Sequence, residues 1–286
     1  MQIIQDKASL QAFVAKQRQE GKSIGFVPTM GALHQGHLSL IEACRAENEI
    51  VICSIYVNPT QFDNKTDLAK YPKNLHSDAT LLVDASVDIL FAPEDDEMYP
   101  EGLETISSTI SFGKLESVME GKHRKGHFAG VGLVVSKLFH IVKPDRAYFG
   151  QKDLQQYAVI RQMVADFSFG IELKRCPIVR ETDGLAMSSR NVRLTERERF
   201  VASKLHETLQ SAKNMLQEGK SLNEIKDTAI ANICKHKDFK IEYFEIVDLK
   251  TLQSLSEMQK EPMAICVAAY LGQVRLIDNI IAEEFN

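Results

Sequence analysis

One segment, residues 26–38 (FVPTMGALHQGHL), constrains the chain most, because it joins an apolar run to a helical pattern through two glycines and two histidines. Residues 24–27 are apolar and precede a proline, which favours a buried parallel strand, and residues 38–47 have the apolar spacing of a helix. The first turn of a helix carries unpaired N–H groups and the positive end of the macrodipole, so it stabilises a phosphate. Gly31 and Gly36 would let a phosphate approach closely. The sequence therefore predicts a nucleotide-phosphate site between this strand and this helix.

The two histidines decide the kind of site. The glycine spacing is that of a P-loop, but His37 stands where that motif carries lysine. His34 and His37 instead form an H-x-G-H tetrapeptide that resembles the signature of the nucleotidyltransferase superfamily, whose members attack the α-phosphate of ATP and expel pyrophosphate. A neutral imidazole at the positive end of a helix donates its N–H to phosphate oxygens that gain charge in the transition state. A zinc pair is the alternative, but no third and fourth ligands follow in a recognisable spacing.

The bulk composition limits the classes of protein to which this chain can belong. Its 286 residues suffice for a full core and for two domains, and its net charge of −5 argues against a nucleic-acid partner, since phosphate backbones attract basic surfaces. The five cysteines are widely spaced and lie mostly in apolar runs, which predicts reduced thiols. Neither a signal-peptide pattern nor a run of membrane-spanning length occurs, so we expect a cytoplasmic protein with no membrane partner.

Alternating strand and helix patterns in the first part of the chain predict a parallel α/β sheet, with ligands at the carboxyl ends of its strands. The expected strands are 24–27, 50–57, 87–92, 146–149 and 171–179, and the expected helices are 38–47, 75–85, 132–142 and 154–166. After residue 190 the pattern changes, which predicts a smaller domain of helices and strands. Its expected helices are 195–218 and 222–235, and its expected strands are 241–247, 263–270 and 274–277, with a tight connection at 271–273.

Polar side chains follow several of these strands. Gln61 in VNPTQF suits a substrate hydroxyl or carboxylate, although a solvated turn is the alternative. The loop EGKHRKGHFAGV combines cations with glycines, which suits a mobile anion-binding loop or a solvated basic loop, and offers Arg124 as a possible phosphate contact. Lys152 and Asp153 in FGQKDLQQ open a helix, where lysine would neutralise phosphate and the acid would hold magnesium or cap the helix.

The segment LAMSSRN places two hydroxyls beside a guanidinium, at Ser188, Ser189 and Arg190. This arrangement suits the oxygens of a triphosphate through charge-assisted hydrogen bonds, and a simple linker is the alternative. A serine nucleophile is not expected, since neither a G-x-S-x-G elbow nor a triad partner accompanies these residues. Binding is therefore the role that we predict for this segment.

The chain resembles the pantothenate synthetase (pantoate–β-alanine ligase) family in five motifs with the family's order and spacing: VPTMGALHQGH, VNPTQF, EGKHRKGHFAGV, FGQKDLQQ and LAMSSRN. The resemblance covers nearly the whole chain and includes VAAYLGQVRLIDN near its end. It implies that (R)-pantoate and ATP give pantoyl adenylate and pyrophosphate, and that β-alanine then gives pantothenate and AMP. It also implies an α/β fold with a Rossmann-like domain at 1–183, a smaller lid-like α+β domain at 184–286, and a homodimer.

The resemblance assigns roles to the residues that match the family's motifs. It implies catalytic roles for His34, His37 and Lys152, with His37 as a proton donor and Lys152 bridging the phosphate and the nucleophile. Gln61 and Gln156 would hold pantoate, and Gln61 would also help to admit β-alanine. The residues implied to bind ATP are Met30, Gly31, Ala32, Leu33, His34, Gln35, Gly36, His37, Gly150, Gln151, Lys152, Asp153, Val179, Met187, Ser188, Ser189 and Arg190.

Two positions depart from the family's pattern. Many relatives carry Glu where Gln151 stands, which removes a carboxylate next to Asp153, the residue implied to lie near Mg²⁺. Many carry Pro where Lys125 stands, so the mobility of that loop would differ. Two other functions stay open: a nucleotidyltransferase that moves AMP to a phosphate acceptor, and a nucleotide sensor without catalysis.

Overall fold

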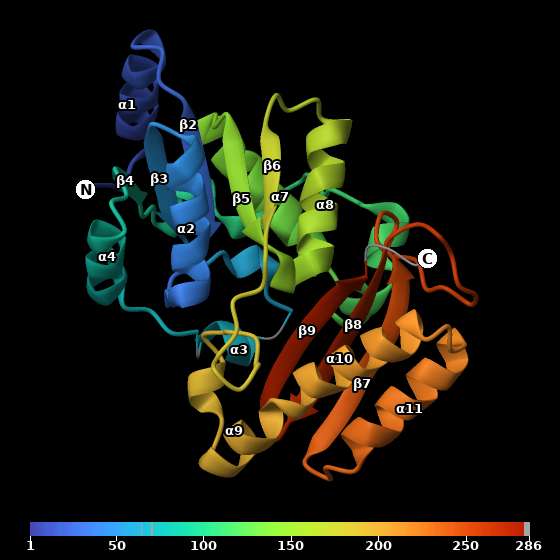
Figure 1. Cartoon of the computed structure of the whole chain (residues 1–286). Coiled ribbons are helices and arrows are strands. Elements are labelled where there is room, and N and C mark those ends of the chain that lie inside the picture. The colour runs from blue at the N-terminus through green and yellow to red at the C-terminus, as the bar shows by residue number, and fades with distance from the viewer. Residues whose placement is uncertain (64, 70, 283–286) are drawn as a thin grey trace.

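The computed structural model describes residues 1–63, 65–69 and 71–282, and in these residues the larger sheet has six parallel strands (Figure 1). In spatial order the strands are β1 (Gln2–Ile4), β4 (Ile89–Phe91), β3 (Ile50–Ile55), β2 (Ile24–Thr29), β5 (Arg146–Gly150) and β6 (Glu172–Cys176). The alternating patterns of the sequence thus do build a parallel sheet, and the predicted Rossmann-like α/β fold is confirmed.

Helices cover both faces of this sheet, because its strands are apolar on both sides. One face packs on α1 (Lys7–Gln19), α7 (His127–Val142) and α8 (Leu154–Asp166), and the other packs on α2 (Gln35–Glu47) and α4 (Leu75–Asp84). The alternation is clear in β3, where Ile50 and Ile52 join the first cluster and Val51 and Cys53 join the second. The sequence patterns had predicted neither β1 nor α1.

The strand order reverses between β2 and β5, which is where a doubly wound sheet opens a ligand crevice beyond the carboxyl ends of its strands. These two strands pair at only two positions, Gly25 with Arg146 and Phe26 with Ala147. Beyond those pairs β2 continues along β3, and β5 continues along β6. The carboxyl ends of β2 and β5 therefore diverge, and the segments that follow them flank an opening.

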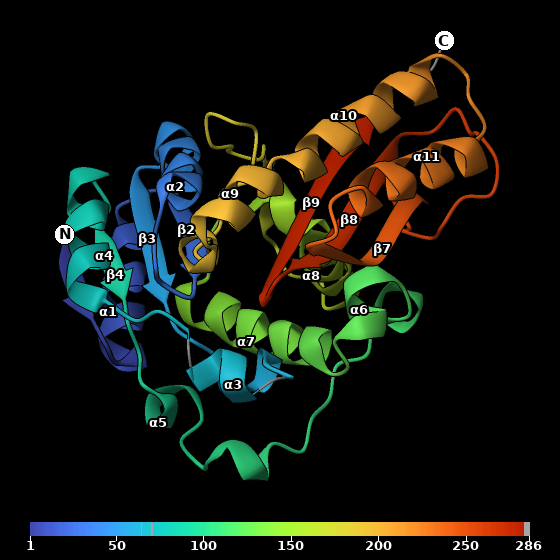
Figure 2. The same cartoon turned by 90° about the horizontal axis from the view of Figure 1, so that it is seen from below.

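A second, antiparallel sheet lies in the C-terminal part in the order β7 (Phe239–Asp248), β8 (Met263–Leu271) and β9 (Val274–Ala282). One face packs on α10 (Lys204–Gln217) and α11 (Leu222–Cys234), and the other packs on α8 and α6 (Met119–His123) (Figure 2). Gly272 and Gln273 join β8 to β9, which confirms the predicted tight connection. The smaller α+β domain is thus present, whereas its exact boundary at residue 184 stays a prediction.

The single helix predicted at 195–218 is wrong. The structure has two helices there, α9 (Glu196–Ala202) and α10, which meet at Ser203. Ser203 keeps helical φ and ψ values and its hydroxyl makes no capping hydrogen bond to α10, so its own side chain does not explain the break. The predicted helix start is confirmed, since Thr195 forms a capping box with Glu198.

Two other helices begin before their predicted starts. α2 begins at Gln35 instead of residue 38, which places His37 inside the first turn, and α7 begins at His127 instead of residue 132. The remaining short elements are η1 (Pro59–Gln61), α3 (Lys65–Ala69), α5 (Asp95–Met98), η2 (Leu103–Thr105), η3 (Gly113–Glu116), η4 (Gln151–Asp153) and η5 (Asn191–Arg193). Across the part of the chain that the structure describes, no helix has the length and apolar character needed to span a membrane.

Candidate active site

His34 and His37 cap the start of α2 through a reciprocal pair of hydrogen bonds. Nδ1 of His34 accepts from the backbone N–H of Gly36 at 3.1 Å, and Nδ1 of His37 accepts from the backbone N–H of His34 at 3.3 Å. Because both Nδ1 atoms accept, each neutral ring carries its proton on Nε2. The ring centroids are 4.2 Å apart. The helix start therefore presents two N–H donors side by side.

Both rings are uncharged at neutral pH. Burial lowers the pKa of His34 to about 4 and that of His37 to about 3, and the positive charge of Lys152 contributes to both shifts. The sequence predicted this neutral state for imidazoles at the positive end of a helix. A neutral ring donates to a phosphate oxygen without repelling the nearby ammonium of Lys152.

Gly36 is required by the contact between the two ends of this H-x-G-H segment. A Cβ atom at this position would lie 2.9 Å from Cε1 and 3.0 Å from Nδ1 of His34. Any larger residue would therefore push the His34 ring away from the helix start. The central glycine of the motif thus follows from the packing of the ring against the backbone.

The backbone amides of the preceding turn are paired inside the protein. The N–H of Gly31 donates to Oγ1 of Thr29 at 3.2 Å, and the N–H groups of Ala32 and Leu33 donate to the carboxylate of Asp78 at 2.9 and 2.8 Å. These three amides therefore have partners within the protein. The prediction of unpaired N–H groups concerned the first turn of the helix, where the N–H groups of Gly36 and His37 also bond to His34.

A cavity of about 200 Å³ lies between the carboxyl ends of β2 and β5. Part of its wall is apolar and comes from α7 and β5, at Val131, Val134, Val135, Leu138 and Phe149. The predicted site residues that line it are Met30, His34, Gly36, His37, Gln61, Gly150, Lys152, Asp153, Gln156, Val179, Met187, Ser188, Ser189 and Arg190. The structure thus brings together segments from separate motifs of the sequence.

The other predicted residues lie around this cavity without lining it. Gly31, Ala32, Leu33 and Gln35 belong to the turn and helix start that hold the two histidines, and the side chain of Gln151 turns towards β9. Their contact with ATP stays a prediction.

Gln61 is held in place by a buried asparagine. Nδ2 of Asn58 donates to Oε1 of Gln61 at 3.2 Å, and Nε2 of Gln61 donates to Sδ of Met30 at 2.9 Å. Oδ1 of Asn58 accepts from the hydroxyl of Tyr99 at 2.8 Å, and only 1% of Asn58 is exposed. The alternative of a solvated turn at VNPTQF is therefore wrong, because the buried Asn58 orients Gln61.

Arg124 is connected to the same cavity through His127. Nδ1 of His127 contacts the backbone oxygen of Gln61 at 2.7 Å, so this nitrogen donates and Nε2 accepts from Nη1 of Arg124 at 3.1 Å. Burial, with help from the Arg124 charge, lowers the pKa of His127 to about 4. A neutral histidine therefore links the guanidinium to the short helix η1, which carries Gln61.

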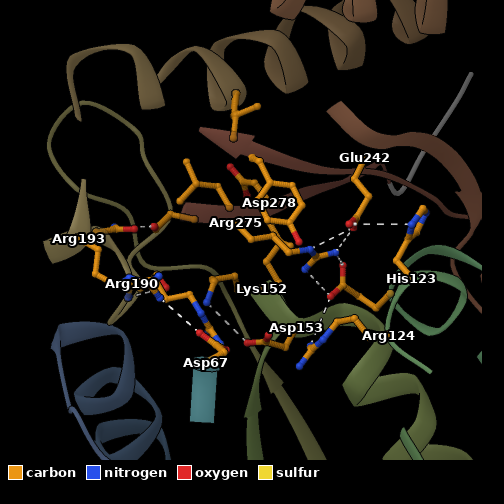
Figure 3. Close-up of a pocket in the computed structure, with 18 of the residues that line it drawn as sticks. Asp67, His123, Arg124, Lys152, Asp153, Arg190, Arg193, Glu242, Arg275 and Asp278 are labelled. Atoms are coloured by element: carbon orange, nitrogen blue, oxygen red, sulfur yellow. Dashed lines mark hydrogen bonds and ion pairs between the residues drawn. The ribbon is translucent and has the colours of Figure 1, made fainter. Parts of the chain in front are cut away.

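A second, charged cavity of about 360 Å³ adjoins the first and shares Lys152, Asp153, Ser188 and Arg190 with it. Figure 3 shows Lys152 and Asp153 between two groups of ion pairs. Arg190 and Arg193 contact Asp67 at 2.9 and 3.3 Å on one side, and Arg275 contacts Glu242 on the other.

Arg124 lines this second cavity instead of the first. Among the described residues, five cationic side chains and six carboxylates line this second cavity, and its arginines (Arg124, Arg190, Arg193 and Arg275) are each paired with at least one of these acids.

Asp78, Asn58 and His127 are the functional candidates that sequence reasoning missed. Asp78 and His127 lie in the first turns of α4 and α7, where polar residues commonly serve the helix itself. Their partners are distant in sequence: Leu33 for Asp78, and Gln61 for His127. In the sequence, Asp78 and His127 can be recognised only as polar residues near the start of an apolar helix. That position does not show which residue they bind.

The family model described as "Pantoate-beta-alanine ligase" matches residues 2–281 of this chain. Among curated proteins, the chain is 48% identical to the pantothenate synthetase of Caldicellulosiruptor bescii over 284 residues, which covers 99% of each chain. It is 46% identical to the pantothenate synthetase of Thermotoga neapolitana over 282 residues, with coverages of 98% and 99%.

Two solved structures agree with these matches. Pantothenate synthetase from Thermus thermophilus superposes with a TM-score of 0.92 at 41% identity and covers 100% of both chains. Pantoate-β-alanine ligase from Francisella tularensis, complexed with β,γ ATP and β-alanine, superposes with a TM-score of 0.82 at 36% identity, covering 98% of this chain and 97% of the other.

Proposed function

The chain belongs to the pantoate–β-alanine ligase family, and we propose that it condenses (R)-pantoate with β-alanine through a pantoyl adenylate in the cavity between β2 and β5. Its activity is the ATP-dependent formation of pantothenate. One observation carries the proposed site: two neutral histidines, Lys152 and two glutamine side chains surround one cavity at the point where the strand order reverses.

In the first step, a carboxylate oxygen of pantoate attacks the α-phosphorus of ATP, and the bond from that phosphorus to the β-phosphate oxygen breaks. Negative charge grows on the phosphate oxygens and on the departing pyrophosphate. This negative charge is stabilised by the Nε2–H groups of His34 and His37 and by the ammonium of Lys152. Ser188, Ser189 and Arg190, which line the same cavity, would bind the rest of the triphosphate.

In the second step, the amine nitrogen of β-alanine attacks the carbonyl carbon of the adenylate. The bond from that carbon to the AMP oxygen breaks, the nitrogen loses a proton, and pantothenate and AMP are formed. The adenylate is an activated anhydride that water also hydrolyses, so the apolar wall of the cavity serves to limit the access of water. Gln61, which lines the cavity, would help to admit β-alanine.

The cavity suits pantoate, which joins two methyl groups on one carbon to hydroxyl and carboxylate groups. Val131, Val134 and Val135 offer an apolar surface to the methyl groups. Gln61 and Gln156 offer amides to the oxygens of the acid. Because Asn58 fixes Gln61 before any ligand binds, little side-chain freedom would be lost there.

We infer that Mg²⁺ enters with ATP and that Asp153 lies near it. No cluster of three or more His, Cys, Asp or Glu side chains suited to a metal occurs within the described residues. That arrangement fits Mg²⁺ bound by one or two carboxylates together with phosphate oxygens, which neutralises charge on the triphosphate. Asp153 lines both cavities, and its Oδ2 is 3.8 Å from Nζ of Lys152.

The direct test mixes the protein with Mg²⁺, ATP and D-pantoate and measures pyrophosphate in a single turnover, then adds β-alanine and measures AMP and pantothenate. Pyrophosphate before the amine, and AMP only after it, are the expected results. Nucleotide binding without pyrophosphate release would reject the adenylation step and favour a sensor. A phosphate acceptor that replaces pantoate would favour the other nucleotidyltransferase.

A homodimer and a cytoplasmic location are further proposals. The homodimer rests on resemblance to the family, and sedimentation of the purified chain tests it: a mass of twice 32.2 kDa is expected and a monomer would reject it. The location rests on the sequence pattern, and fractionation of cells that express the tagged chain tests it.

A further inference from the structure

The turn that carries Lys152 is hydrogen-bonded to a buried side-chain amide in the smaller domain. Asn279 lies in β9 of the smaller domain and is 3% exposed. Its Nδ2 donates to the backbone oxygens of Gln151 and Lys152, each at 3.0 Å. Its Oδ1 accepts from Nε2 of Gln151 at 3.2 Å. Both the amide nitrogen and the amide oxygen of Asn279 are thus engaged with the turn η4.

These contacts hold the main chain of Lys152 and do not involve its side chain. Nδ2 of Asn279 binds backbone oxygens, so it holds the main chain of η4 between β5 and α8. The Lys152 side chain then projects to the place where the two cavities meet. A small displacement of the main chain here would move the ammonium away from the phosphate, and catalysis depends steeply on such distances.

The strand that carries Asn279 is itself held by several contacts. β9 pairs with β8 along its length, and the neighbouring Asp278 accepts from Nη1 and Nη2 of Arg180 at 2.7 and 3.0 Å. Arg180 belongs to the segment that leads to the hydroxyl and guanidinium groups of the site. The strand that holds η4 is therefore also tied to the segment that precedes Ser188.

We propose that Asn279 is a positioning residue for adenylation, which acts by holding the Lys152-bearing turn in register with the phosphate site. The inference rests on the proposed function, because it takes Lys152 as the group that acts on ATP. Gln151 supplies the third contact, because its Nε2 donates to the amide oxygen of Asn279.

The test uses full-length protein and measures single-turnover pyrophosphate release with saturating D-pantoate over a range of ATP concentrations. Asn279→Ala removes all three contacts, and Asn279→Asp removes both N–H donors at nearly constant volume. Each should slow adenylation at least about tenfold and change the KM for ATP less than about threefold, since an interaction made mainly in the transition state is lost. The Asp variant also answers the question if the Ala variant does not fold.

Arg161→Ala is the matched control. Nη2 of Arg161 in α8 donates to the backbone oxygen of Lys250, so this variant also removes a bond from the larger domain to a carbonyl next to β7. It does not touch η4. We expect its adenylation rate to stay within about twofold of the unmodified protein, because an exposed hydrogen bond contributes little.

A double variant shows whether Asn279 acts through Lys152. When Lys152 is already alanine, adding Asn279→Ala should slow pyrophosphate release by no more than about twofold, because the group that Asn279 positions is absent. A further tenfold loss in the double variant, or normal rates for both Asn279 variants beside a slow Lys152→Ala, would overturn the inference. A normal rate for Lys152→Ala alone would instead reject the proposed function.

Discussion

Replacing Asp78 with asparagine should disable the turn that holds the histidines while leaving the fold largely intact. Asp78 is 4% exposed, and its two carboxylate oxygens accept from the N–H groups of Ala32 and Leu33 at 2.9 and 2.8 Å. Asparagine keeps the size of the side chain but replaces one of these oxygens with an NH₂ group. One backbone N–H then faces another donor and loses its partner.

The size of the effect follows from the bond that is lost. A hydrogen bond to a charged group contributes about 1.5–3 kcal/mol, so one lost bond costs about 2 kcal/mol, or about thirtyfold in an equilibrium. Gly31 and Ala32 have φ values of 84° and 51°, a left-handed conformation that Ala32 adopts only when its surroundings hold it there. We therefore expect the turn to change conformation locally when one of its hydrogen bonds to residue 78 is lost.

The assay compares kcat/KM for ATP in pyrophosphate release with the free energy of unfolding in urea. Asp78→Asn should lower kcat/KM about thirtyfold and lower the free energy of unfolding by less than about 2 kcal/mol, because part of the loss is local. Asp84→Asn is the control, since Asp84 lies in the last turn of the same helix and is exposed. The reasoning fails if Asp78→Asn keeps kcat/KM within about twofold, or if the whole loss appears in unfolding.

Three further predictions concern the histidines and Lys152. Lys152→Ala and His37→Ala should each slow adenylation at least about a hundredfold with little change in melting temperature, and near-normal turnover of either would contradict its assigned role. Gly36→Ala should slow the same step at least about tenfold, because its Cβ would displace the His34 ring, without a loss of helix stability; an unchanged rate would show that the ring position does not matter. The free energy of unfolding should fall as the pH drops from about 6.5 towards 4, because the unfolded chain then binds protons that His34, His37 and His127 in the folded chain do not. The fall should reach up to about 1.4 kcal/mol per pH unit for each of these histidines. Urea titrations at pH 7 and pH 5 measure this slope, and His127→Asn should reduce it; an equal slope in that variant would contradict the neutral state of His127.

The sequence predicted those parts of the site that local chemistry defines. His34 and His37 are three residues apart at a helix start, so their proximity follows from helix geometry alone. Gln61 and Lys152 each follow a strand, and the parallel order of the strands brings such ends together. The cavity thus confirms the prediction that these segments meet, although the role of each residue stays a proposal.

The contacts that were missed depend on tertiary packing. Nothing near Asp78 in the sequence shows that its carboxylate binds the turn at Ala32, and nothing near Asn279 shows that its amide binds the turn at Lys152. The split at Ser203 is of the same kind, since a helical pattern continues through it and only packing decides where the axis breaks. Long-range pairing of this sort has no periodic signal in the sequence.

The smaller sheet has consequences for how the enzyme opens. Its inner face packs on α6 and α8 through apolar side chains, among them Val247 and Ala264 against Met119 and Leu154. A rigid-body rotation of the smaller domain would expose those side chains to water. Such exposure is unfavourable, because burying apolar groups stabilises a protein in proportion to the area removed from solvent. Rotation of the smaller domain away from α6 and α8 would therefore cost free energy in proportion to this apolar area, and the lid-like role that the family resemblance implies stays a prediction.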